Sequence, residues 1–224
     1  MTRKAATAPA PAAPRRRRPQ QSRARATAQA IRDAFEELLV ERGYERVSIR
    51  QIIAHAGVGI GSFYEYFSSK AELASVCVHL RVKQIRMTMA ERLAQVRELP
   101  LPARVDAVLA AQVAPLFEKP EQWRALFLVE RQVSDIEAYR KQYAEFVQMW
   151  EQVLCEGPGW PAEAPLAEAA FAVHAISYSL MSQGLMTSAA PPEAQLWQRQ
   201  LRRAVHGYLS LLAPLAYRLY RFDD

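Results

Sequence analysis

Catalysis needs acidic, basic or nucleophilic side chains at one site, and this sequence shows no pattern that would bring such groups together. Its four histidines are scattered, at His55, His79, His174 and His206. The motifs G-x-S-x-G and H-E-x-x-H and the phosphate-binding P-loop are absent. Cys77 and Cys155 stand alone, with neither a C-x-x-C pair nor a histidine spacing suited to zinc. We therefore expect a binding protein rather than an enzyme, with no cofactor and no metal.

The positive charge is concentrated at the start of the chain. The chain has 224 residues and a formal net charge of +6 at pH 7. Residues 1–70 contain 13 Lys and Arg against 6 Asp and Glu, whereas residues 71–224 contain 16 against 17. This asymmetry favours a polyanion as the partner of the first third of the chain. A basic, solvated tail without a partner is the alternative.

A helical pattern extends through most of the chain. Gly is sparse, at 8 residues, and 50% of the residues are hydrophobic without strand-like alternation. These features favour an all-α fold. The apolar periodicity and the placing of Pro and Gly predict about nine helices, at about 22–42, 49–56, 60–67, 69–97, 102–117, 120–133, 135–155, 165–188 and 192–212.

The segment before the first helix has a different composition. Residues 1–21 are rich in Ala, Pro and Arg and are expected to form a disordered basic arm. Arg15–Arg18 lead into polar residues, so a signal peptide is not expected. The chain also lacks a stretch of about 18 uncharged apolar residues, which a membrane span needs. Two isolated cysteines suit a reducing compartment, and the cytoplasm is the expected location.

Two short helices joined by a glycine-containing turn follow the first amphipathic helix, an arrangement typical of a helix-turn-helix. Ser48 is the expected N-cap of the first short helix. The second short helix would enter a DNA major groove about 12 Å wide, which requires small side chains at the contact. Gly59, Gly61 and Ser62 provide this clearance. A loose turn is the alternative explanation for the glycines.

The run from Val47 to Leu73, VSIRQIIAHAGVGIGSFYEYFSSKAEL, resembles the DNA-binding segment of the TetR family of transcription regulators. The family pattern is an apolar two-turn helix, A-G-V, a recognition helix of small residues, Y-x-[YH]-F, and K-x-x-L at the start of the next helix. The resemblance covers about residues 23–75. It implies a helix-turn-helix DNA-binding domain over residues 22–70, after the arm at 1–21, and an effector-binding and dimerisation domain over residues 71–224.

By this resemblance, the two short helices contact double-stranded operator DNA. The contacts to bases are expected from Arg50, Ile60, Gly61 and Tyr64. Arg50 can bind a phosphate or a guanine edge, and a paired contact with guanine discriminates between bases by about 1–3 kcal/mol. The contacts to phosphates are expected from Ser48, Ser62, Tyr66 and Lys70. The hydroxyl of Ser48 has a second possible role, which is to satisfy its own helix terminus.

The resemblance also implies a pocket for a small effector in the C-terminal part, where aromatic residues form helical stripes. An ordinary hydrophobic core is the alternative explanation of these stripes. The candidate ligand-binding residues are Trp123, Phe127, Tyr143, Phe146, Trp150, His174 and Tyr178. The last two long helices are expected to join two copies as a homodimer. Two recognition helices about 34 Å apart would then reach successive major grooves of a palindrome.

The sequence thus predicts an all-α protein with an N-terminal three-helix helix-turn-helix domain and a C-terminal helical ligand-binding and dimerisation domain. The predicted function is that of a sequence-specific transcription regulator, a repressor that a small, largely apolar ligand releases from its operator. A transcription activator is one alternative. A helical protein-interaction scaffold with non-specific nucleic-acid binding is the other. No membrane partner is expected.

Overall fold

The computed structural model describes residues 17–190 and 193–220, which form helices joined by short turns. An N-terminal group comprises α1 (Arg17–Arg42), the 3₁₀ turn η1 (Tyr44–Arg46), α2 (Ile49–Ala56) and α3 (Ile60–Tyr66). The remaining helices are α4 (Lys70–Val96), α5 (Leu101–Glu118), α6 (Pro120–Val133), α7 (Ile136–Cys155), α8 (Leu166–Thr187), α9 (Ala194–Leu212) and α10 (Pro214–Tyr217). The all-α fold class is confirmed. None of the helices in the described ranges is long and apolar enough to cross a membrane.

The two ends of the fold differ from the expected boundaries. The first helix begins at Arg17 rather than near Ser22, so residues 17–21 of the predicted disordered arm are helical. Pro19 is compatible with this start because the first backbone N–H groups of a helix have no intrahelical acceptor. Residues 1–16, the rest of the arm, lie outside the described residues. At the other end, α9 stops before Pro214, as expected, but a further short helix, α10, follows.

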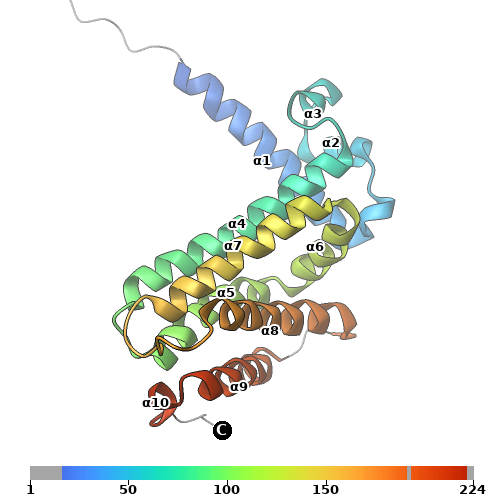
Figure 1. Cartoon of the computed structure of the whole chain (residues 1–224). Coiled ribbons are helices and arrows are strands. Elements are labelled where there is room, and N and C mark those ends of the chain that lie inside the picture. The colour runs from blue at the N-terminus through green and yellow to red at the C-terminus, as the bar shows by residue number, and fades with distance from the viewer. Residues whose placement is uncertain (1–16, 191–192, 221–224) are drawn as a thin grey trace, which may run out of the picture.

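A continuous core joins the N-terminal group to the rest of the protein. Phe35 of α1 and Phe63 of α3 are fully buried, together with Leu73 and Ala74 of α4. The first turns of α4 therefore belong to the core of the helix-turn-helix as well as to the helical body. Figure 1 shows α4 and α7 running side by side through that body, and α1 packs against both α4 and α6.

Arg104 on α5 is a fully buried cation that binds backbone carbonyls at the end of α7 and in the loops after α4 and α7. Its guanidinium donates to the carbonyls of Leu99 at 2.7 Å, Val153 at 2.7 Å, Leu154 at 3.1 Å and Pro158 at 3.3 Å. Carbonyls at a helix C-terminus lack intrahelical donors and attract cations. Arg104 thus fixes the ends of α4 and α7 against α5.

Asp106, also on α5, holds the C-terminal helices in place. Arg202 of α9 donates to both carboxylate oxygens, at 2.8 and 2.9 Å. The Nε2 atom of His206 lies 2.7 Å from Oδ1, and the Tyr220 hydroxyl donates to Oδ2 at 2.9 Å. The Nδ1 atom of His206, which is fully buried, lies 2.8 Å from the hydroxyl of Tyr217 on α10. One carboxylate therefore connects α5, α9 and the chain end.

We predict that Asp106→Asn destabilises the protein at neutral pH. Burial alone would raise the pKa of this carboxyl, but hydrogen bonds from His206, Arg202 and Tyr220 outweigh burial and lower the pKa to about 2. An unfolded Asp has a pKa of about 4. The ionised carboxyl therefore stabilises the fold above about pH 4, and this stabilisation is lost as the pH falls towards 2. We expect urea denaturation at pH 7 to show a loss of about 1–3 kcal/mol in the free energy of unfolding.

The matched control is Glu163→Gln, which neutralises an exposed carboxyl. This variant should unfold like the wild type at every pH. The gap between Asp106→Asn and the wild type should narrow as the pH is lowered from 5 to 3. A variant at position 106 that is as stable as the wild type at pH 7 would contradict the role given to Asp106.

Candidate nucleic-acid interface and internal pocket

Local interactions fix the two short helices. At the start of α2, the Ser48 hydroxyl accepts from the backbone N–H of Gln51 at 3.3 Å, and the Ser48 N–H donates to the Gln51 side chain at 2.9 Å. This reciprocal pair is a capping box. Gly57 ends α2 in the left-handed conformation, at φ +66°, which favours glycine. Gly59 is the N-cap of α3, so only Gly61 lies within the recognition helix.

The outer face of α3 is open to an incoming molecule. Ile60 and Tyr64 are 51% and 56% exposed, whereas Phe63 is fully buried and anchors the helix. A Cβ added at Gly61 would meet no other atom within 4 Å, so no contact within the protein explains this glycine. Arg50 on α2 is also exposed, and Ser62 and Tyr66 are half-buried. The structure thus brings the predicted base-contacting residues to the surface of adjacent helices.

Two of the predicted phosphate contacts have partners within the protein. The hydroxyl of Ser48 takes part in the capping box. Two roles were expected for it, a phosphate contact and the cap of its own helix, and the structure shows the cap. The ammonium group of Lys70 donates to the carbonyls of Tyr44 at 2.9 Å and Val47 at 3.0 Å, and it lies 4.1 Å from the centre of the Tyr44 ring. Lys70 therefore braces the turn before α2. Its third ammonium proton remains for a phosphate, and that contact stays a prediction.

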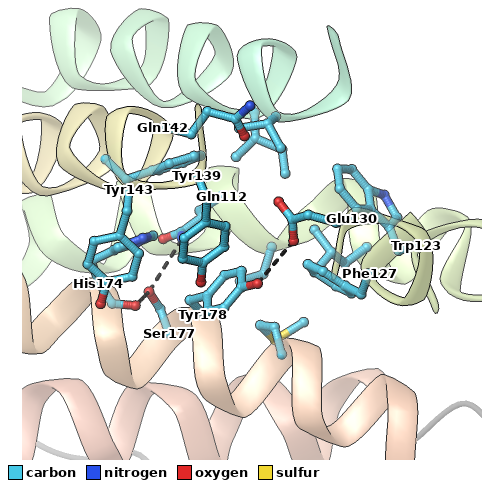
Figure 2. Close-up of a pocket in the computed structure, with 16 residues that line it drawn as sticks. Gln112, Trp123, Phe127, Glu130, Tyr139, Gln142, Tyr143, His174, Ser177 and Tyr178 are labelled. Carbon is cyan, nitrogen blue, oxygen red and sulfur yellow. Dashed lines mark hydrogen bonds between the residues drawn. The ribbon is translucent and has the colours of Figure 1, made fainter. Parts of the chain in front are cut away.

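Helices α4 to α8 enclose a cavity of about 60 Å³ (Figure 2). Small-molecule pockets usually measure about 300–1,000 Å³, so a ligand would have to displace side chains. Six of the seven candidate ligand residues line the cavity: Trp123, Phe127, Tyr143, Phe146, His174 and Tyr178. The seventh, Trp150, does not. It lies one helical turn beyond Phe146 on α7 and is fully buried in the core, because the aromatic stripe is longer than the cavity.

Polar residues outside the set of candidate ligand residues also line this cavity: Gln112, Glu130, Tyr139, Gln142 and Ser177. The Tyr178 hydroxyl donates to Glu130 at 3.1 Å, and the Gln112 amide donates to the Ser177 hydroxyl at 3.3 Å. Burial raises the pKa of Glu130. In the sequence, Glu130 could have been recognised by its position three residues after Phe127, because this spacing places a charge on the same face of the helix as Phe127.

His174 lies at the centre of the aromatic part of the cavity. Its ring stacks on Phe146 with a centroid distance of 5.0 Å and an interplanar angle of 2°, and the Tyr143 ring is 4.3 Å away. Burial lowers the pKa of His174 to about 4, so the ring is neutral at physiological pH. Its Nδ1 atom and the Oε1 atom of Gln112 are both buried without a hydrogen-bond partner among the described residues.

Helix α6 touches both the cavity and the helix-turn-helix. Trp123, Phe127 and Glu130 of α6 line the cavity. Gln122, the residue next to Trp123, donates to the Glu36 carboxylate of α1 at 2.5 Å. Arg81 of α4 binds the same carboxylate, with its Nε atom 3.2 Å from each oxygen. A displacement of α6 by a bound molecule would therefore reach α1 directly.

Known proteins are similar to the N-terminal part of the chain in sequence and to most of the chain in fold. Residues 31–77 match the family model for bacterial regulatory proteins of the tetR family. A stretch of 52 residues is 40% identical to the Transposon Tn10 TetC protein of Escherichia coli, and it covers 23% of this chain and 26% of that protein. The chain thus spans about a quarter of the length of this curated relative.

Solved structures share the whole architecture at low sequence identity. A protein from Pseudomonas aeruginosa PAO1, described as a transcriptional regulator, is 19% identical, with a TM-score of 0.67 and coverage of 92% of this chain and 97% of that one. A TetR-family regulator from Streptomyces coelicolor is 20% identical, with a TM-score of 0.61 and coverage of 83% and 99%. The regulator FadR from Bacillus subtilis, solved with stearoyl-CoA, is 18% identical, with a TM-score of 0.59 and coverage of 83% and 97%.

The pair α2–α3, which α1 braces on an otherwise all-helical body, defines a helix-turn-helix protein. The match to the family model identifies residues 31–77 as the DNA-binding segment of the tetR family of bacterial regulatory proteins. Members of this family are DNA-binding transcription regulators, and some respond to ligands.

We predict that Lys70→Met lowers the stability of the protein in the absence of any nucleic acid. The substitution keeps the length of the side chain but removes two charge-assisted hydrogen bonds to the turn before α2. Because hydrogen bonds to charged groups contribute about 1.5–3 kcal/mol when well shielded, we expect a loss of about 1–2 kcal/mol for this half-buried group. Urea denaturation followed by circular dichroism measures it.

Lys83→Met is the control, because Lys83 is an exposed lysine on the same helix. It should leave the free energy of unfolding within about 0.5 kcal/mol of the wild type. If Lys70→Met and Lys83→Met prove equally stable, the bracing role of Lys70 is wrong.

Proposed function

We propose that this protein is a homodimeric, sequence-specific transcription repressor that binds double-stranded operator DNA and leaves it when a small, largely apolar ligand binds. The outer face of α3 is the observation that carries the proposal, since Ile60, Gly61 and Tyr64 are free for a major groove. Arg50, Ser48, Ser62, Tyr66 and Lys70 are the further DNA contacts. The proposed division of labour is DNA binding by residues 22–70 and effector binding and dimerisation by residues 71–224.

The proposed dimer face is formed by α8 and α9. Several residues of these helices are buried within the subunit, including Val173, Leu201 and Leu209. Leu180 and Leu196 remain about 40% exposed, and α8 and α9 border a groove lined by Ile176 and Trp197. Apolar side chains exposed on neighbouring helices suit an interface between two copies. A two-fold axis there would set the spacing of two recognition helices to successive major grooves.

Release by a ligand is supported by the position of α6. The cavity is too small for a typical effector, so binding would move side chains of α6, which contacts Glu36 of α1 through Gln122. A ligand changes DNA affinity only through its different affinities for the two arrangements of the protein. Of the two alternatives, activation and a scaffold that binds nucleic acid without sequence preference, the scaffold leads to a different result in the first test below.

We predict that Gly61→Leu weakens operator binding at least about tenfold, a change of about 1.4 kcal/mol, without destabilising the fold. A Cβ added at Gly61 would meet no atom of the protein within 4 Å, and a leucine side chain would stand between α3 and the floor of the groove. The operator is first obtained by selecting duplexes from a random pool with the purified wild-type protein. Gel shifts with the selected duplex and a scrambled competitor then give the affinities.

The control is Ala90→Leu, which adds similar bulk on an exposed part of α4 and should bind the operator like the wild type. A selection that enriches no sequence would favour the scaffold alternative. Full operator affinity in Gly61→Leu would show that α3 does not enter the groove.

We also predict reciprocal coupling between the cavity and the DNA. Compounds that raise the melting temperature of the wild-type protein can be titrated with and without the selected operator. For a compound that weakens operator binding, we expect the operator to weaken the binding of that compound by the same factor, on the order of 5–150-fold, because such linkage is thermodynamically symmetric. Equal ligand affinities in the presence and absence of operator would reject induction by that compound.

A further inference from the structure

The charges around the cavity are unevenly distributed. Within the part of the chain that the structure describes, no Lys or Arg lines the cavity, and Glu130 is the one acidic side chain there. His174 is neutral at physiological pH because burial lowers its pKa to about 4. Burial also raises the pKa of the Tyr143 and Tyr178 hydroxyls, so both keep their protons. A molecule in this cavity therefore meets one acidic side chain and no Lys or Arg.

Two arginines on the same helix as Glu130 make their hydrogen bonds to other groups, although the charge of Arg131 still acts on Glu130 through space. The guanidinium of Arg131, the next residue, donates to the Phe127 carbonyl at 3.1 Å and lies 3.4 Å from the sulfur of Met186. Arg124, on the same helix, donates to carbonyls at the end of α8. Among the described residues, the hydrogen-bond donor to the Glu130 carboxyl is the Tyr178 hydroxyl. A carboxylate can accept about four hydrogen bonds, so most of its capacity is unused.

A buried carboxyl that receives so few hydrogen bonds favours a cation as its partner. A buried charge is unfavourable unless it is paired and hydrogen-bonded, and Glu130 is only 6% exposed. Gln112 adds an unpartnered carbonyl oxygen, Oε1, which is a second acceptor without a donor. The Glu130 carboxyl and the Gln112 Oε1 atom both have capacity to accept hydrogen bonds. A ligand that complements them carries positive charge or donates hydrogen bonds.

Aromatic rings surround the same carboxyl. Figure 2 shows Glu130 between Trp123 and Phe127 on one side and Tyr178 on the other. The Trp123 and Phe127 ring centroids are 5.8 Å apart, and those of Phe127 and Tyr178 are 5.9 Å apart. Faces of Trp, Tyr and Phe attract cations, with Trp the strongest. Rings around a carboxyl therefore suit a cation with an apolar surface, such as an alkylated ammonium group.

We propose that this cavity binds a compact organic monocation, with its charge beside Glu130 and its apolar part among the rings of α6, α7 and α8. The inference rests on the proposed function, because it names the chemical class of the ligand that the effector pocket takes. The small cavity volume, about 60 Å³, means that the ligand opens the site by moving side chains. An anionic ligand is disfavoured, since its charge would face Glu130 and no Lys or Arg lines the cavity.

Two isosteric probes test this. (4-Hydroxyphenyl)trimethylammonium and 4-tert-butylphenol have the same shape and the same hydroxyl, and they differ in one atom, N⁺ against C. Isothermal titration calorimetry with the full-length wild-type protein should show that the ammonium probe binds at least about tenfold more tightly. Equal affinities, tighter binding of the phenol, or no detectable binding of the ammonium probe would overturn the proposal. Neither titration requires a variant.

A substitution then locates the charge. Glu130→Gln keeps the size and an acceptor for the Tyr178 hydroxyl, so we expect it to weaken binding of the ammonium probe about tenfold and that of 4-tert-butylphenol less than about twofold. Glu137→Gln removes the same charge from a carboxyl that is 82% exposed on α7 and should change neither affinity. If Glu130→Gln, shown folded by its melting curve, binds the ammonium probe like the wild type, Glu130 is not the counter-charge.

The outcome of the probe titrations can be distinguished from the outcome of the test of the proposed function. Binding of the selected operator duplex is measured on the same preparation without either probe. Operator binding without preference for the ammonium probe overturns the cation site and leaves the regulator intact. Preference for the ammonium probe in a protein that binds no duplex supports the cation site and rejects DNA regulation.

Discussion

Glu36 determines how the helix-turn-helix is attached to the rest of the protein. Its carboxylate lies on α1, is 5% exposed, and is held by Arg81 of α4 and Gln122 of α6. Removing one partner from a buried carboxylate costs several kcal/mol, about 3–5 in measured cases. The three helices therefore stay in contact in any stable arrangement of the protein. The orientation of α1, and with it that of α2 and α3, depends on where α4 and α6 lie.

Helix α6 connects this attachment to the cavity through adjacent residues. Gln122 binds Glu36, and Trp123, the next residue, lines the cavity and donates to the Pro115 carbonyl of α5 at 3.0 Å. Ser75 of α4 donates to the carbonyl of Val133, the last residue of α6, at 3.3 Å. Densely packed interiors change between discrete arrangements rather than by continuous deformation. In the proposed mechanism, a molecule that enlarges the cavity would change the position of α6 as a unit, and the helix-turn-helix would follow it.

Sequence reasoning worked where the determining interactions are local. The N-cap at Ser48, the stop at Gly57 and the apolar periodicities depend on residues a few positions apart, so the helices and the open face of α3 could be predicted. The buried charges could not. Arg104, Asp106 and Glu36 are in sequence ordinary charged residues on helices, and Asp106 meets its partner His206 only because the fold joins residues 100 positions apart. Six of the seven candidate ligand residues, which came from the local aromatic stripes, line the cavity. The position of Glu130 in the cavity and the acceptors of Lys70 depend on contacts between distant residues and could not be predicted.

In the proposed homodimer, symmetry would enlarge the effect of a small shift. Helices α8 and α9, which form the proposed interface, lie at the opposite end of the subunit from α3 (Figure 1). A rotation of α6 and α4 relative to this interface displaces the recognition helix by an amount that grows with its distance from the axis. The two subunits move in opposite directions about a two-fold axis, so the change in separation is twice the displacement of one. Because the groove spacing of duplex DNA is set at about 34 Å, a shift of a few ångströms is enough to break the match.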